Sequence, residues 1–301
     1  MFLFSEGGGH HTPLIVEFIN HYVGEPVYHF QMAYTRPIWV AFFNKFGTTP
    51  EKVFASEYSP QTAIPWYTVM FVIACILTVV AVRLLKGRLS DDDPKPGQLT
   101  LEAGYLAIKG LVVSVIGEHG FKYFPVVATF AILILVSNLM GQFPLFMSPT
   151  ASVNVTFALG ISSFVYYNYV GIAENGIWGH LGHLAGPRLP ILLTLVITPL
   201  IFAIELISNL IRPFTLGVRL FANMFSDEKV FLEITNLAPP ITHFVLPLVL
   251  TMLGVFVAFV QAFVFTLLST IYLSEVSHAH HDEHEDEPGV EAHGEAVVAH
   301  A

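Results

Sequence analysis

The sequence predicts an all-α integral membrane protein with five membrane-crossing helices and one interfacial helix, in which the last two spans form a long, steeply tilted hairpin. The first observation is composition, because 54% of the 301 residues are hydrophobic and only 12% are charged, whereas soluble domains average about 25% charged residues. The second is a set of apolar stretches that reach the ~20 residues a helix needs to cross a bilayer. The third is that the last two of these stretches are far longer than one crossing requires.

Charge and cysteine content exclude several other classes of protein. The formal net charge is -10, but much of it lies in the tail after Glu275, so the membrane part is closer to neutral. No basic patch predicts a nucleic-acid partner, and the single cysteine, Cys75, excludes an internal disulfide. Neither a cofactor nor a metal centre is predicted for the membrane part.

Residues 1–62 are predicted to form an extramembrane or interfacial arm, because no apolar run there is long enough to span a bilayer. The first residues also lack the basic region and the long apolar region of a signal peptide. The membrane domain then covers residues 63–276. A tail at 277–301 alternates histidines with acidic residues, which predicts disorder, and metal binding is the alternative role for such a tract.

The first predicted span, residues 64–85, carries the clearest orientation signal. Trp66 and Tyr67 form an aromatic belt at its start. Basic residues cluster at its other end: Arg83, Lys86 and Arg88. By the positive-inside rule the segment that follows is cytoplasmic, so the N-terminus is predicted outside and, after five spans, the C-terminus in the cytoplasm.

Residues 100–122 have one apolar and one charged face, which suits a helix lying on the membrane surface. The alternative is a soluble-facing helix that packs on the protein. Two further spans, residues 124–147 and 153–172, are joined as a hairpin by a short polar turn. A loop containing Gly, His and Pro is predicted from 174 to 188.

The final two stretches, residues 189–226 and 240–274, exceed the thickness of a membrane. A helix of that length extends about 55 Å, against a hydrocarbon core of ~30 Å. Prolines permit a break in each stretch: Pro199 and Pro213 in the first and Pro247 in the second. We favour a steep tilt over a break, with a loop over residues 226–239 between the two spans.

A polar stripe in the first of these spans carries the candidate chemistry. Glu205, Arg212 and Arg219 are spaced by seven residues, which falls ~20° short of two full helical turns, so the three charges share one helix face. Further polar residues lie beside them: Ser208, Asn209, Thr215 and Asn223. Such a stripe through an apolar helix lines water, a ligand or a polar group of another protein.

Arg219 is the costliest residue of this stripe. A guanidinium at membrane depth costs at least ~3 kcal/mol, and arginine does not escape that cost by losing its proton. No acid partner is evident in its own span, so we interpret Arg219 as functional. For Glu205 and Arg212 two interpretations stay open: a functional site, or a salt-bridge ladder that only fixes packing.

Gln261 is the deep polar residue of the last span, and small residues at spacings of four allow close helix packing around it: Gly254, Ala258 and Ala262. An amide both donates and accepts, so Gln261 orients Arg219, holds a water, or makes a simple interhelical hydrogen bond. On the outer side, Glu228 is a candidate proton relay. Asp227 and Glu233 are interpreted as solvated loop acids.

These residues resemble the subunit a family of F-type ATP synthases. The motifs are Glu205…Arg212-Pro-Phe-Thr-Leu-Gly-Val-Arg219-Leu-Phe-Ala-Asn223-Met and, further along, Gln261-Ala-Phe-Val-Phe-Thr-Leu-Leu-Ser-Thr-Ile-Tyr272-Leu. Asn138-Leu-Met-Gly-Gln-Phe-Pro144 and Ser152-Val-Asn-Val-Thr156 resemble the first hairpin of the family. The resemblance covers roughly residues 64–276.

The resemblance implies a non-catalytic subunit of the bacterial inner membrane that couples proton flow to rotation and ATP synthesis. Its implied partners are the lipid bilayer, a rotating ring of c subunits with one mid-membrane carboxylate each, subunit b of the peripheral stalk and the remaining synthase subunits. Arg219 is implied to face the ring carboxylates and to separate two offset half-channels. The other matching residues are Glu205 and Ser208 on the cytoplasmic side, Asn223, Glu228 and Gln261 on the outer side, and Arg212 within the stripe.

Two positions depart from the family pattern, because many bacterial relatives have Asp where this chain has Gly141 and an ionisable residue where it has Gly254. One outer carboxylate is therefore expected to be absent. Glu228 is then left with either water or His243 as its partner.

Two other functions compete with this hypothesis. A stand-alone secondary ion transporter would use Arg219 to bind an anionic substrate, but five spans without an internal repeat count against it. A non-conducting membrane anchor is disfavoured by the buried charge stripe.

Overall fold

The computed structural model describes residues 4–5, 12–45, 47–48, 59–60, 63–87, 89–90, 94–143, 146–184, 191–237 and 245–277. Over these ranges the chain is helical apart from its connections and one antiparallel pair of two-residue strands, β1 (Phe4–Ser5) and β2 (Thr12–Pro13). The prediction of a helical protein is therefore confirmed. The predicted tail lies, from residue 278 onward, outside the described residues.

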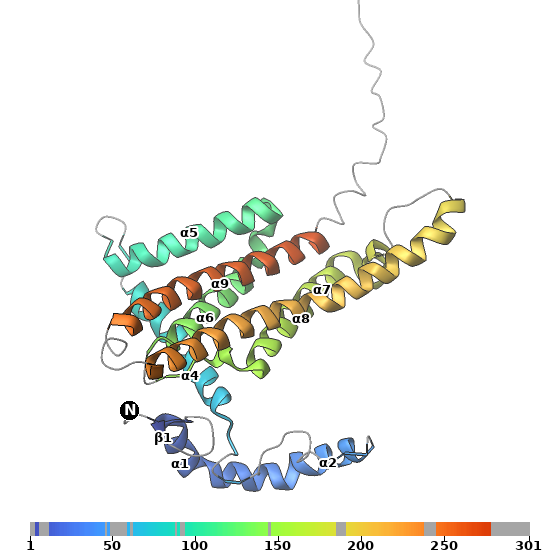
Figure 1. Cartoon of the computed structure of the whole chain (residues 1–301). Helices are drawn as coiled ribbons and strands as arrows, with labels where there is room; N and C mark the ends of the chain where they lie inside the picture. The colour runs from blue at the N-terminus through green and yellow to red at the C-terminus, as the bar shows by residue number, and fades with distance from the viewer. Residues whose placement is uncertain are drawn as a thin grey trace, which may run out of the picture.

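The N-terminal arm is a helical segment along one side of the main bundle (Figure 1), and Val16 at its start is buried against α4 (Trp66–Lys86) and α6 (Phe124–Met140). It consists of α1 (Leu14–Phe30), a π-helical turn η1 (Gln31–Thr35) and α2 (Arg36–Asn44). Asn20 ties the arm to the chain just before the next helix, because its amide donates to the Ile64 carbonyl (3.1 Å) and accepts from the Ile64 N–H (3.2 Å). Aromatic side chains are exposed along the arm: Phe18, Tyr22, Phe30, Tyr34, Trp39 and Phe42.

The helix α4 (Trp66–Lys86) matches the first predicted span. It connects the side of the bundle where the arm lies to the side where α5 (Pro96–Ile116) lies (Figure 1). It ends at Gly87, whose φ of 49° suits a glycine at the end of a helix. The end of α4 touches the start of α5, since a Cβ on Gly97 would lie 3.0 Å from the Leu85 carbonyl oxygen.

The helix predicted over residues 100–122 has different ends in the structure. α5 starts earlier, at Pro96, because proline fits the first turn of a helix. It stops at Gly117, where φ is 93°, and the short 3-10 helix η2 (Glu118–Tyr123) follows. The segment is therefore one helix and a separate turn.

The helix α6 (Phe124–Met140) ends before the predicted boundary at residue 147. A turn leads into the 3-10 helix η3 (Pro149–Ala151), and this connection folds back on α6 because the Ser148 hydroxyl donates to the Ser137 carbonyl (3.0 Å). The apolar run outlasts the helix because Phe146 still packs against a buried cluster shared by α1, α4 and α6.

The helix α7 (Val153–Leu184) starts at its predicted residue but continues beyond 172. Gly176 interrupts it with φ 71° and ψ 167°, a conformation that glycine adopts readily. The predicted loop from 174 is therefore a kinked helical segment as far as residue 184. Glu174 fixes this region, because Lys122 and Tyr123 of η2 both bond its carboxylate.

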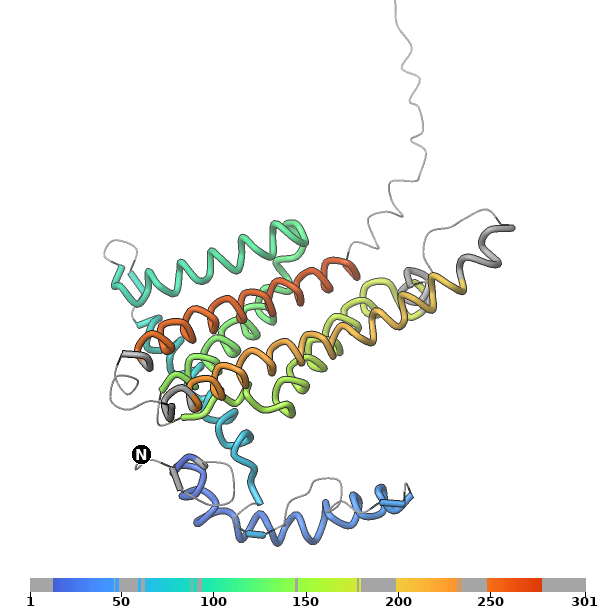
Figure 2. Tube along the Cα trace, in the orientation of Figure 1, coloured from blue at the N-terminus to red at the C-terminus, as the bar shows by residue number. Residues whose placement is uncertain are grey.

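The last two helices, α8 (Ile191–Leu237) and α9 (Val245–Ser277), run antiparallel and lie side by side (Figures 1 and 2). α8 has 47 residues and stays one helix through Pro199 and Pro213. At helical rise it extends about 70 Å, more than twice a hydrocarbon core of ~30 Å. The predicted loop over 226–239 is wrong as far as residue 237, because the helix continues beyond the apolar stretch into polar sequence.

Six helical stretches in the described part are long and apolar enough to cross a membrane, by length and composition alone. They are Trp66–Lys86, Pro96–Ile116, Glu118–Met140, Val153–Ile177, Pro199–Phe231 and Leu248–Ser277. Because α5 is among them, the length and composition of the helices do not distinguish a protein with five spans and an interfacial helix from one with six spans. That division, and the tilt of the last two helices, stay predictions.

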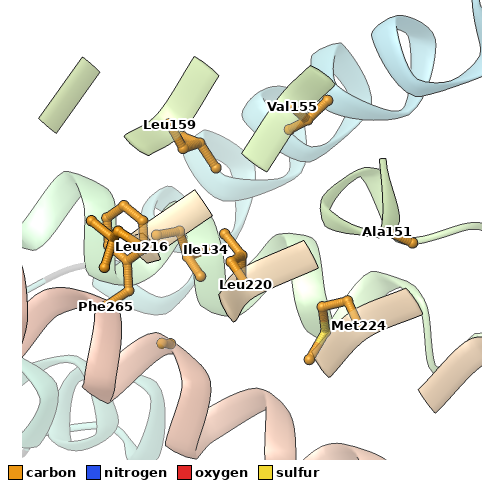
Figure 3. Packing of buried hydrophobic residues seen from close by; sticks show 9 residues of the cluster. Ile134, Ala151, Val155, Leu159, Leu216, Leu220, Met224 and Phe265 are labelled. Atoms are coloured by element: carbon orange, nitrogen blue, oxygen red, sulfur yellow. The ribbon is translucent and has the colours of Figure 1, made fainter. Parts of the chain in front are cut away.

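The main core lies where α6, α7, α8 and α9 meet. Figure 3 shows buried side chains from all four helices and from η3 converging on one another. The labelled members are Ile134, Ala151, Val155, Leu159, Leu216, Leu220, Met224 and Phe265. The middle of α8 is therefore packed on one side, and its other side is left for the exposed residues described below.

Close packing of α7 against α8 depends on two glycines. A Cβ on Gly160 would lie 2.6 Å from the Pro213 carbonyl oxygen, and one on Gly217 would lie 3.2 Å from the Thr156 carbonyl oxygen. Small residues allow such approach of two backbones within a membrane. This crossing fixes the part of α8 that carries the polar stripe.

Candidate functional site

Arg212 lies between two carboxylates, one on its own helix and one on α9. Its Nη2 is 3.0 Å from Glu205 Oε1. Two further bonds join it to Glu275, from Nη1 to Oε2 at 2.6 Å and from Nη2 to Oε1 at 2.9 Å. The guanidinium also lies over the Tyr272 ring, 5.0 Å from its centroid. The pair of Glu205 and Arg212 allowed by the sequence is thus present, and it extends to the neighbouring helix.

Glu275 was not among the predicted site residues. It lies in the last turn of α9, which ends at Ser277. From the sequence alone, a carboxylate at the end of a span looks like an ordinary solvated side chain. Its bond to Arg212 joins positions 63 residues apart, and helical periodicity reports only neighbours within one helix. One signal was available, because Tyr272 and Glu275 are three residues apart and share a helix face.

The neighbouring polar residues of α8 pack against α7. The hydroxyl of buried Tyr167 bonds the side-chain oxygen of Asn209, and Asn209 Nδ2 donates to Asn168 Oδ1 (3.3 Å). Ser208 is partly buried and makes no side-chain hydrogen bond with any residue that the structure describes. This end of the stripe is therefore held by two other helices.

Arg219 has a different environment from Arg212, although both lie on the same stripe. Its side chain is exposed on α8. Among residues 191–237, 245–277 and the other described ranges, it has no ion-pair or hydrogen-bond partner. Its charge is therefore not offset within the described chain.

Gln261 joins α9 to α8 one turn beyond Arg219. It is buried, with 3% of its surface exposed, and its Oε1 accepts a hydrogen bond from Asn223 Nδ2 at 2.6 Å. Its Nε2 is buried without a partner among the described residues. The contact is the interhelical hydrogen bond that the sequence allowed, and it reaches Asn223 rather than Arg219.

Near the C-terminal end of α8, the structure brings together three residues that were considered separately in the sequence. Asp227 accepts a hydrogen bond from Gln142 Nε2 at 3.0 Å. Gly254 faces this pair, since a Cβ there would lie 2.5 Å from the Gln142 amide atoms and 2.8 Å from Asp227 Oδ2. The interpretation of Asp227 as a solvated loop acid is wrong, because the residue is helical, partly buried and bonded.

The other two acidic residues predicted on the outer side differ from Asp227. Glu228 is partly buried and has no hydrogen bond or ion pair within the described part of the chain. Glu233 is exposed, as expected for a solvated acid, although it lies on the helix. His243, the alternative partner of Glu228, lies outside the described residues.

Further buried polar atoms lie at the end of α6. The Thr150 hydroxyl donates to Asn138 Oδ1 at 2.6 Å. Ser137 Oγ and Asn138 Nδ2 are buried without a partner in the described ranges. Buried polar atoms of this kind are the groups that internal water hydrogen-bonds in proteins. In the same ranges, no group of three or more His, Cys, Asp and Glu side chains is placed to hold a metal ion.

Beside the polar stripe that carries Arg219, α8 also exposes an apolar stripe. Exposed side chains recur along α8 at spacings of three and four: Leu200, Ile204, Ile207, Ile211, Phe214 and Val218. α9 also exposes large apolar side chains: Met252, Phe256, Phe259 and Phe263. The arrangement is thus one exposed positive charge next to an apolar stripe, with the bonded charge cluster of Arg212 before it along α8 and the bonded amides of Asn223 and Gln261 after it.

Comparison with known proteins agrees with these features. The chain matches the family model described as ATP synthase A chain over residues 64–274. ATP synthase subunit a 3 of Pelobacter propionicus is 40% identical over 213 residues, which cover 70% of this chain and 85% of the relative. ATP synthase subunit a of Trichlorobacter lovleyi is 40% identical over 218 residues, covering 72% and 87% of the two chains.

A third relative is similar over a longer range. ATP synthase subunit a of Geobacter sp. (strain M21) is 38% identical over 240 residues, which cover 79% of this chain and 97% of the relative. The family match spans nearly all of the predicted membrane domain, and the identities extend over most of each relative. The chain therefore belongs to the ATP synthase subunit a family.

Proposed function

We propose that this chain is the proton-conducting stator subunit of an F-type ATP synthase, and that Arg219 meets the carboxylates of a neighbouring ring of c subunits. The observation that carries the proposal is the exposed guanidinium of Arg219, which has no partner within the described residues. At membrane depth such a charge costs at least ~3 kcal/mol. Its counter-charge is therefore expected on another chain.

The fixed charge of Arg219 favours the deprotonated form of each ring carboxylate as that carboxylate passes. A permanent two-bond pair, such as the one between Arg212 and Glu275, would instead hold the ring in place. Arg219 also prevents direct proton transfer between the two half-channels. A proton crossing 100 mV gains only about 2.3 kcal/mol, so several are needed per ATP and leaks must be suppressed.

The polar residues on either side of Arg219 are proposed to line the two half-channels. Glu205 and Ser208 lie toward the start of α8, on the cytoplasmic side, with Arg212 between them and Arg219. Asn223, Gln261 and Glu228 lie on the outer side. Asp227 joins the outer group, because its partly buried carboxylate lies where Gly254 leaves room. The bonded amides support a polar path through an otherwise apolar hairpin.

The apolar surface of α8 and α9 is proposed to face the ring. An exposed apolar stripe with one guanidinium at its edge is complementary to apolar helices that each carry one carboxylate. Subunit b of the peripheral stalk and the other synthase subunits are the remaining proposed partners, since the stator must be held against the ring.

The arrangement of the helices supports five spans with an interfacial α5. The arm and α5 lie on opposite sides of the layer formed by α6 to α9, and α4 joins the two sides (Figure 1). With α4 upright in the bilayer, both segments lie at membrane surfaces, and α8 and α9 cross at a steep tilt. Arg83 and Lys86 in the last turn of α4 put the α5 side in the cytoplasm. The N-terminus is then outside a bacterial inner membrane.

Reconstitution separates this proposal from a stand-alone transporter. The purified chain alone is placed in liposomes, and the whole synthase is placed in a matched set. We expect proton movement only with the whole complex and ATP, because the chain alone lacks the carboxylates that carry protons past Arg219. Ion or anion transport by the chain alone would contradict the proposal. Purification of the chain from its host without a proteolipid ring would also count against it.

A further inference from the structure

Arg212 holds two carboxylates from different helices, and these are not equally covered. Its side chain is 18% exposed, whereas those of Glu205 and Glu275 are 33% and 36% exposed. Arg212 is thus more covered than either of the two glutamate side chains that it holds. Among the described residues, the other titratable side chains at the cluster are Tyr272 of α9, whose ring lies against the guanidinium, and Tyr167 of α7.

The cluster has one positive and two negative formal charges. When one carboxylate takes a proton, the other still pairs with Arg212, so no buried charge is left alone. In a simple pair the same protonation would strand the guanidinium, which is strongly unfavourable for a covered charge. Three charges therefore allow one proton to enter and leave while Arg212 remains compensated.

The cluster lies on the α5 side of the molecule, away from Arg219. The Ser274 hydroxyl donates to the Val115 carbonyl at 2.9 Å, so the last turn of α9 lies against the end of α5. Glu205 is two heptads before Arg219, or about 21 Å along the helix. The carboxylates are thus at the membrane surface that the proposed topology assigns to the cytoplasm.

From this geometry we propose that Glu275 is a second proton-exchanging carboxylate at the cytoplasmic mouth, interchangeable with Glu205. The inference rests on the proposed function. During ATP-driven pumping, a Glu275 or Glu205 carboxylate oxygen accepts a proton from a hydronium ion at the cytoplasmic surface. That O–H bond then breaks as the proton passes to water inside the half-channel and on to a ring carboxylate. No electron is transferred, and synthesis uses the reverse order.

The test compares variants of the whole complex in inverted membrane vesicles, with ATP-driven acidification as the readout. We expect Glu205→Gln and Glu275→Gln each to slow pumping measurably, by about two-fold, because one carboxylate remains, and the double variant to lose at least about tenfold, below the 10²–10⁴-fold that a positioned acid-base group typically contributes. Glu275→Asp in the Glu205→Gln background should restore pumping, because it returns a carboxylate. Glu118→Gln, an exposed acid on the same side, serves as the control and should be neutral.

A purely structural role is tested by removing the whole cluster. The variant Arg212→Gln/Glu205→Gln/Glu275→Gln leaves no unpaired guanidinium, so the complex should assemble with its ring even where the double variant does not. Assembly with pumping still reduced supports the proposal, and assembly with normal pumping overturns it. Arg219→Ala is measured in parallel. Normal pumping by Arg219→Ala rejects the proposed function itself, whereas loss there with normal pumping by the triple variant rejects only the role of Glu275.

Discussion

At the scale of single residues, two arginines of one stripe have opposite environments. Arg212 is covered and bonded to Glu205 and Glu275, whereas Arg219 is exposed and has no partner in the described ranges. Arginine stays charged in either place, so what differs is the location of the compensating carboxylate. For Arg212 it is on the same chain, and for Arg219 it is proposed to be on the rotor. One arginine holds two helices together and the other is left free to act.

Replacing Gln261 by Leu should weaken pumping without abolishing it. The change removes the acceptor of Asn223, so the hydrogen bond between α8 and α9, worth about 0.5–1.5 kcal/mol, is lost while the charge of Arg219 remains. The measurement is ATP-driven acidification together with the melting temperature of the complex in detergent. The matched control is the double variant Asn223→Leu/Gln261→Leu, which should recover thermal stability because no polar group is left unpaired. If the Gln261→Leu complex pumped protons at the rate of the parent, Gln261 would have only a packing role.

Replacing Gly254 by Ala should lower pumping, because the added methyl group would lie 2.5 Å from the Gln142 amide and 2.8 Å from Asp227. The pair must then separate or move. The control is Gly104→Ala, which meets no atom within 4 Å and improves helix propensity. The rate of ATP-driven pumping at equal amounts of assembled complex is compared. Equal rates for both variants would show that the pair of Asp227 and Gln142 has no part in proton access.

At the scale of helices, glycine contacts determine how α8 is held. Gly160 of α7 and Gly217 of α8 let the two backbones approach near Pro213 and Thr156. The crossing leaves the opposite side of α8 exposed, and Arg219 is on that exposed part. The close contact is therefore one reason why an arginine and an apolar surface can face outward from a helix that is otherwise part of the core.

Gly160→Leu should destabilise the assembled complex, because even its Cβ would lie 2.6 Å from the Pro213 carbonyl oxygen. Overpacking of this kind costs about 1–3 kcal/mol. Thermal denaturation in detergent measures the effect. The same substitution at Gly110, where a Cβ would have no atom within 4 Å, should leave the melting temperature near that of the parent. A neutral Gly160→Leu would mean that the crossing is not tight.

The sequence was most informative about what lies in lipid and less so about where helices end. The start of α4 and α7 and the face shared by Glu205, Arg212 and Arg219 follow from hydropathy and a period near 3.6. The end of α6 at Met140 and the extension of α8 to Leu237 do not. Apolar composition indicates which residues are buried, not which are helical. The turn after α6 is apolar because it packs against the protein, and the last part of α8 is helical although its sequence is polar.

Contacts between helices were the other part that a single sequence does not supply. The bond of Glu275 to Arg212 and the packing of Asp227 beside Gly254 join positions far apart in the chain. Neither contact can be recognised from the neighbouring sequence, because an acidic residue near the end of a predicted span is common and does not indicate a partner. Asn223 and Gln261 were assigned to the same side, but their direct bond needed the register of α8 against α9.

At the scale of the whole molecule, the helices α6 to α9 form a layer between two flanking segments. The arm lies on one side of α6 to α9 and α5 on the other (Figure 1). The exposed aromatic residues of the arm, such as Tyr34 and Trp39, suit a membrane–water boundary, where Tyr and Trp are enriched. This layering is the basis for the proposed orientation.

Cysteine labelling tests the orientation directly. In a Cys75→Ser background, Tyr34→Cys in the arm and Leu106→Cys on α5 are both exposed positions. A membrane-impermeant maleimide added to right-side-out vesicles should label position 34, and the same reagent should label position 106 only in inverted vesicles. The opposite pattern would reverse the topology, and labelling of both positions from one side would contradict an α4 that joins the two surfaces.

The central claim is that Arg219 acts on a carboxylate of another chain, and Arg219→Ala tests it most directly. The measurement is ATP-driven proton pumping by the assembled complex in inverted vesicles, with the amount of co-purified ring determined on the same sample and Lys45→Ala in the arm as the control. We expect Arg219→Ala to assemble but not to pump, because no fixed charge then drives deprotonation or blocks the leak between half-channels. Normal pumping by an assembled Arg219→Ala complex would contradict the account.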